Sequence, residues 1–147
     1  MSVPTIAQPS TWTLLPRSLL FSLGMLVSTG IVASLVVLCG FLSFHRRYRL
    51  SQYWSRFNLW WLRVTCRIDY QVSGGEHVPN QPVIVMAKHQ STWETLFLNQ
   101  HLPPVAWVIK RELLWFPFFG WALALLRPIA INRQLGASAV KQVIRQG

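Results

Sequence analysis

The chain has 147 residues, enough for one compact domain and a membrane segment. Fourteen Lys and Arg residues stand against four Asp and Glu residues, which gives a formal net charge of +10. A chain this basic points to nucleic acid or to anionic lipid as a partner. No nucleic-acid-binding motif is present, so the composition favours membrane lipids and sets nucleic acid aside.

The amino-terminal part predicts a membrane helix. Residues 1–16 are mostly polar and are expected to be flexible, and residues 17–44 are predicted to form a transmembrane helix because Ser18 to Phe44 carry no charge. Such a helix is about 40 Å long, against a hydrocarbon core of about 30 Å, so it can span with tilt. The run is too long for a signal peptide and lacks a small-residue cleavage site.

A basic cluster, His45 to Arg49, follows this run directly. Basic residues beside a membrane helix mark the cytoplasmic side, so we expect an outside amino terminus and a cytoplasmic remainder. A helix that enters the membrane and returns without crossing is the alternative, because Gly24, Gly30 and Gly40 each permit a bend.

Residues 45–65 are predicted to be a basic, Trp-rich interfacial segment with an amphipathic helix over Ser51–Thr65. Its aromatic residues suit the headgroup level, and Arg56 and Arg63 can face lipid phosphates. The alternative is a surface helix that its tryptophans pack onto the protein's own domain.

Residues 66–147 alternate between apolar strand-like runs and helical runs. This alternation predicts an α/β fold, with a small mixed sheet flanked by helices. The expected strands are Ile68–Val72, Val83–Ala87, Val105–Ile109 and Ile129–Asn132, and the expected helices are Thr92–Gln100, Leu113–Leu126 and a helix-like run from Ala137 to Gln146. The aromatic run Leu114–Trp121 is interpreted as core, with contact to the bilayer as the alternative.

The cysteines and histidines predict neither a disulfide nor a metal site. Cys39 lies inside the apolar run and Cys66 at the end of the interfacial segment, so the two are not expected to pair. The four histidines and these cysteines show no metal-ligand spacing.

The segment Lys88–Thr95 (KHQSTWET) carries the candidate chemistry. His89 leaves a predicted strand and Glu94 falls in the first turn of the next helix. A histidine titrates near neutral pH and a carboxylate can fix its tautomer, which is the minimum needed to take a proton from a hydroxyl. The same residues match a capping box, with Ser91 as N-cap and Glu94 reaching back to its backbone, and pattern alone favours this structural interpretation.

The segment resembles the first block of the glycerolipid acyltransferases, the 1-acylglycerol-3-phosphate O-acyltransferase family, whose signature is H-x4-D. Here it reads H-x4-E, with His89 and Glu94 in the catalytic positions. Lys110–Gly120 (KRELLWFPFFG) and Pro128–Arg133 (PIAINR) resemble the next conserved segments. The resemblance assigns contact with the substrate phosphate to Arg133, with Lys110 as a weaker candidate; without it, Arg133 would be interpreted as a solvated residue at a strand end.

The resemblance implies a glycerol-phosphate acyltransferase-like domain in a bacterial inner membrane, with the catalytic part in the cytoplasm. It implies acyl transfer from acyl-CoA or acyl carrier protein to lysophosphatidic acid, with no further cofactor. The family's third block, a Pro-Glu-Gly run, does not follow Arg133, so a partial acyltransferase domain cut from a longer protein is expected. The alternative is a catalytically inactive membrane protein that binds anionic lipid without turnover.

Overall fold

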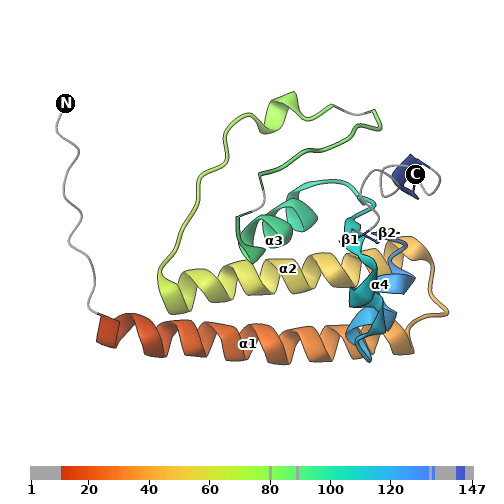
Figure 1. Ribbon diagram of the computed structural model, residues 1–147. Coiled ribbons are helices and arrows are strands. Elements are labelled where there is room, and N and C mark those ends of the chain that lie inside the picture. The colour runs from red at the N-terminus through yellow and green to blue at the C-terminus, as the bar shows by residue number, and fades with distance from the viewer. Residues whose placement is uncertain (1–10, 80, 89, 133, 135–141, 145–147) are drawn as a thin grey trace.

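The computed structural model describes residues 11–79, 81–88, 90–132, 134 and 142–144. In chain order the elements are α1 (Thr11–Leu38), α2 (Phe44–Cys66), the 3-10 turn η1 (Gly75–His77), α3 (Thr92–His101), β1 (Val108–Lys110), the 3-10 turn η2 (Arg111–Trp115), α4 (Phe119–Leu125) and β2 (Ile129–Ile131). α2 packs between α1 and α3, and α4 packs against the end of α1 (Figure 1). The predicted α/β class is confirmed, in a helix-rich form.

α1 is the one helix in the described part of the chain that is long and apolar enough to cross a membrane. Few of its side chains are buried in the protein, and large ones such as Leu19 and Leu26 are 69% and 71% exposed. The helix begins at Thr11, inside the segment expected to be flexible, and ends at Leu38, before the end of the charge-free run. A surface this apolar needs a non-aqueous neighbour.

α2 runs antiparallel to α1 and joins it through small and polar residues (Figure 1). Asn58 is fully buried and donates to Ser28 Oγ at 3.1 Å, and Trp61 Nε1 donates to the Leu20 carbonyl at 3.3 Å. A Cβ on Gly24 would lie 2.1 Å from Trp61 Nε1, so only glycine permits this close approach. The interfacial helix therefore packs on the protein along one face.

The turn between α1 and α2 is closed by a buried arginine. Arg47, predicted as part of a basic cluster exposed at the membrane surface, is 8% exposed and donates from its guanidinium to the carbonyls of Gly40 (2.8 Å) and Leu42. It also donates to the Leu125 carbonyl at the end of α4, at 3.2 Å. This one side chain thus ties the helix hairpin to α4.

Two of the four expected strands are wrong. Residues 68–72 and 83–87 have no strand structure, and Ile84 and Met86 are each 93% exposed. Their apolar, β-branched composition is strand-like, but a strand also needs a neighbour that completes its hydrogen-bond ladder. Within the described residues the sheet contains β1 and β2 alone, which supply no such neighbour.

β1 and β2 form a parallel pair, with Val108 opposite Ile129 and Lys110 opposite Ile131. The expected strands 105–109 and 129–132 are therefore confirmed with shifted ends, but the described sheet is parallel rather than mixed. Tyr48 of α2 is 1% exposed, and its hydroxyl oxygen accepts a hydrogen bond from the Val105 N–H at 3.2 Å. This bond fixes the position of the chain three residues before β1 begins.

The expected helix 113–126 is broken into η2 and α4. Pro117 lies at the break, and Phe118 adopts a positive φ of 59° while the Phe119 N–H donates to the Pro117 carbonyl at 2.6 Å. This is a γ-turn, a conformation that strains a residue with a side chain. A Cβ on Gly120 would lie 2.4 Å from the Leu114 carbonyl oxygen, so glycine is required where the chain folds back on η2. The expected helix from Ala137 to Gln146 falls almost wholly outside the described residues.

Candidate active site

The start of α3 is built by a capping box. Ser91 is the N-cap, and its Oγ accepts a hydrogen bond from the Trp93 N–H at 3.2 Å. Glu94 Oε2 accepts from the Ser91 N–H at 2.9 Å and from Ser91 Oγ at 3.0 Å. The structural interpretation of Glu94 is confirmed: it satisfies donors that the first helical turn leaves open.

The Glu94 carboxylate also contacts the backbone that precedes the N-cap. Its Oε1 accepts from the N–H of Gln90 at 3.4 Å, and Gln90 directly follows His89 in the sequence. Hydrogen bonding lowers the pKa of Glu94, first through its own backbone N–H and then through Ser91, while partial desolvation opposes the shift. The group is therefore an ionised acceptor at neutral pH, the state needed to receive an N–H from an imidazole.

The other predicted site residues are only partly placed. His89 and Arg133 lie outside the described residues, so their predicted roles stay predictions. Lys110 ends β1 with an exposed side chain and pairs in register with Ile131, the last residue of β2. The carboxyl ends of parallel strands share one edge of a sheet, which is where ligands bind in open α/β folds. Lys110 lies at that edge, and Arg133 comes two residues in sequence after Ile131, the partner of Lys110 in β2.

α3 is held in place on two sides. On one face Leu96 and Asn99 are buried, and Asn99 Nδ2 donates to Ser55 Oγ at 2.8 Å and to the Ser51 carbonyl at 3.0 Å. These bonds to α2 fix the helix that carries Glu94 relative to the α1–α2 hairpin. Buried polar contacts of this kind are costly to break, because they leave unpaired groups in the interior.

An aromatic stack covers another face of α3 and was missed at the level of sequence. Trp93 stacks on Phe97 (5.0 Å between ring centroids), and Phe97 stacks on His101 (4.2 Å). Tyr70, from the segment after α2, meets all three rings edge-on. The signal was present, because rings at positions i, i+4 and i+8 share one face of a helix.

Comparison with known proteins identifies the class and then the family. The Acyltransferase family model matches residues 69–147, a range that contains α3, both strands and every predicted site residue. The chain is 47% identical over 133 residues to a 1-acyl-sn-glycerol-3-phosphate acyltransferase of Pseudomonas aeruginosa, which covers 89% of this chain and 52% of that protein. The fold and the capped helix thus define a helix-rich α/β protein. The chain is a member of the Acyltransferase family.

More distant relatives match shorter stretches of the chain. Human 1-acyl-sn-glycerol-3-phosphate acyltransferase alpha is 37% identical over 78 residues, which cover 50% of this chain and 26% of the human protein. A lyso-ornithine lipid O-acyltransferase of Pseudomonas aeruginosa is 29% identical over 85 residues, covering 57% of this chain and 33% of that protein. No solved structure matches the chain. The chain spans about half the length of the Pseudomonas 1-acylglycerol-3-phosphate relative and less of the others.

Proposed function

We propose that the protein containing this chain transfers an acyl group from a thioester to the sn-2 hydroxyl of 1-acylglycerol-3-phosphate, giving phosphatidic acid. The observation that carries the proposal is the H-x4-E segment on the capped start of α3, within a chain 47% identical to a 1-acyl-sn-glycerol-3-phosphate acyltransferase. Acyl-CoA or acyl carrier protein would supply the acyl group, and no other cofactor is required.

In the proposed reaction, His89 takes the proton of the acceptor hydroxyl, and the hydroxyl oxygen attacks the thioester carbonyl carbon. The new C–O ester bond forms, the C–S bond breaks, and the imidazolium gives its proton to the leaving thiolate. Glu94 stabilises the imidazolium and fixes its orientation, and its ionised state at neutral pH suits that role. No acyl-enzyme is needed.

Recognition of the acceptor phosphate is assigned to Arg133 and Lys110. The exposed Lys110 at the carboxyl edge of the sheet supports this placement. A guanidinium makes two parallel charge-assisted bonds to phosphate, whereas an ammonium acts as a point charge, so Arg133 carries the larger share.

The test is acyl transfer from a radiolabelled thioester to lysophosphatidic acid, using membranes that contain the parent chain or its His89→Ala variant. Loss of a positioned base is expected to lower the rate by about 10²–10⁴. His77→Ala is the matched control, because His77 is exposed and lies on the 3-10 turn η1, outside the H-x4-E segment in sequence, and it should keep the parent rate. Equal rates for the parent and His89→Ala would contradict the mechanism. Absence of product from both would favour a lipid-binding protein without turnover.

A second acceptor is suggested by the lyso-ornithine lipid relative. Including lyso-ornithine lipid in the same assay separates the two acceptors, because that lipid lacks the phosphate that Arg133 and Lys110 would bind. Faster transfer to lyso-ornithine lipid would replace the proposed acceptor while leaving the roles of His89 and Glu94 intact.

We further infer that the chain is seated in a membrane through the α1–α2 hairpin. The exposed apolar surface of α1 supports this seating. The catalytic part is expected in the cytoplasm, because basic residues cluster at the start of α2.

A further inference from the structure

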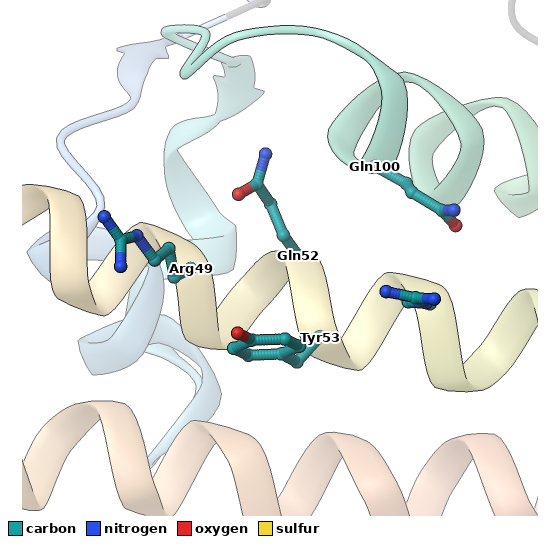
Figure 2. Close-up of a pocket in the computed structure, with 5 residues that line it drawn as sticks. Arg49, Gln52, Tyr53 and Gln100 are labelled. Carbon is teal, nitrogen blue, oxygen red and sulfur yellow. The ribbon is translucent and has the colours of Figure 1, made fainter.

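A polar cleft lies between α2 and the end of α3. Its volume is about 420 Å³, and its walls are formed by Arg49, Gln52, Tyr53, Arg56 and Gln100. Figure 2 shows Arg49 and Gln52 extending from α2 and Gln100 standing on α3. A cleft of this size accommodates a small headgroup or a ligand of similar bulk.

The charge of this cleft is positive and uncompensated. Within the described residues, neither Arg49 nor Arg56 forms an ion pair or a side-chain hydrogen bond, unlike Arg63, which pairs with Asp69 at 3.2 Å. None of the chain's four carboxylates lines the cleft. Arg49 and Arg56 are seven residues apart on one helix, so they lie on the same face about 10 Å apart along its axis. Two unpaired guanidinium groups on one face favour the binding of an anionic ligand between them.

The remaining wall residues suit a phosphorylated ligand that also carries hydroxyl groups. Tyr53 and Gln52 offer an O–H and an amide N–H for phosphate oxygens. The Oε1 atom of Gln100 is buried and has no hydrogen-bond partner in the described part of the chain. A ligand hydroxyl that donates to this oxygen would satisfy it, since a buried acceptor left unpaired is costly.

The cleft is separate from Glu94, the predicted catalytic residue that the structure describes. Gln100 lies six residues beyond Glu94 on α3, which is about 9 Å along the helix axis. Neither Glu94 nor Lys110, the two predicted site residues that the structure describes, is among its lining residues. Most of its lining residues belong instead to α2, the helix that packs directly against the apolar α1.

We propose that Arg49 and Arg56 form a discrete binding site for a phosphoryl group, with Gln100 accepting a neighbouring ligand hydroxyl. A phospholipid headgroup such as phosphoglycerol has this chemistry at the membrane surface, and a soluble phosphorylated compound has it in water. The site is independent of the proposed acyl transfer and goes beyond general attraction of a basic surface to anionic lipid.

The test measures binding of dihexanoyl-phosphatidylglycerol, a short soluble lipid, to the full chain in an uncharged detergent by tryptophan fluorescence. Arg49→Gln/Arg56→Gln is compared with Arg46→Gln/Arg63→Gln, which removes the same charge from exposed positions of the same helix. The first pair should weaken binding by about tenfold or more, because charge-assisted hydrogen bonds to the phosphate are lost. The control pair should change it less than about twofold. Equal losses would overturn the proposal, because they would show diffuse electrostatics.

Two further arms complete the experiment. Arg49→Lys/Arg56→Lys keeps the charge and the helix, so weaker binding by this variant supports recognition by guanidinium geometry even if the glutamine variant fails to fold. Inorganic phosphate and coenzyme A replace the lipid in parallel titrations. Binding of these ligands alone, lost with the same arginines, assigns the phosphoryl site to a soluble ligand. Absence of binding by lipid, phosphate and coenzyme A alike would overturn it.

Discussion

Glu94 holds the start of α3 and is also the proposed partner of His89. The two roles draw on one property, a carboxylate kept ionised by the hydrogen bonds of the capping box. The capping box was predictable from Ser91 to Glu94, because it depends only on residues three apart in sequence. The dyad was not testable in the same way, since it depends on where His89 lies.

Glu94→Gln should lower the stability of the protein in a pH-dependent way. The pKa of Glu94 is lowered in the folded chain, so its contribution is fully present above its ordinary value of 4.5 and is lost as the pH falls through the lowered folded value. The Tm of Glu94→Gln should therefore be below that of the parent at pH 7, and the two should converge toward pH 3.

Thermal unfolding in detergent, followed by circular dichroism at both pH values, checks this difference. Glu76→Gln is the matched control, because Glu76 is an exposed carboxylate in the first turn of a short 3-10 element. A Tm deficit of Glu94→Gln that stays constant from pH 7 to pH 3 would rule out ionisation as its cause.

The elements that sequence predicted well are those specified by local signals. The expected helix 92–100 is α3 to within one residue, because its cap, its apolar positions and Pro103 are all nearby in sequence. The expected strands at 68–72 and 83–87 failed because a strand depends on a distant partner that no local pattern shows. The break at Pro117 was signalled by proline, but the positive φ of Phe118 was not.

The attachment of α3 to α2 also depends on distant partners and can be measured. Asn99 donates to Ser55 Oγ at 2.8 Å, and both side chains are buried. Asn99→Ala should lower the free energy of unfolding by about 1–3 kcal/mol, because it leaves buried polar groups unpaired. The same loss should weaken acyl transfer by the complete protein, since α3 carries Glu94.

A double-mutant cycle isolates this contact. Asn99→Ala, Ser55→Ala and the double variant should show a coupling energy of at least about 0.5 kcal/mol in denaturant unfolding. Leu98→Ala serves as the control on the same helix, because Leu98 is only half-buried, and its pairing with Ser55→Ala should be additive. Additive losses for Asn99 and Ser55 would show that the hydrogen bond does not hold α3 on α2.

At the scale of the whole molecule, the α1–α2 hairpin bears on the proposed membrane seating. The sequence predicted a transmembrane helix and left open a helix that enters and returns. In the structure α2 lies along α1, and Asn58 contacts Ser28 near the middle of both helices (Figure 1). Arg56, two residues from Asn58, would then lie near the bilayer centre of a crossing hairpin, at a cost of about 2.5–3.5 kcal/mol or more. The packing therefore favours a hairpin that does not cross.

Cysteine labelling in sealed, oriented membrane vesicles tests this seating. The background chain carries Cys39→Ser and Cys66→Ser, so it has no cysteine of its own. A single cysteine then replaces either Trp12, near the start of α1, or Phe41, just after its end, and both positions are 85% exposed. A hairpin that does not cross places both positions on one side, so an impermeant maleimide should label both from the same side. Permeabilised vesicles, in which both positions react, control for intrinsic reactivity. Labelling of the two positions from opposite sides would show that α1 spans. Another part of the protein would then have to shield Arg56 of α2 from lipid.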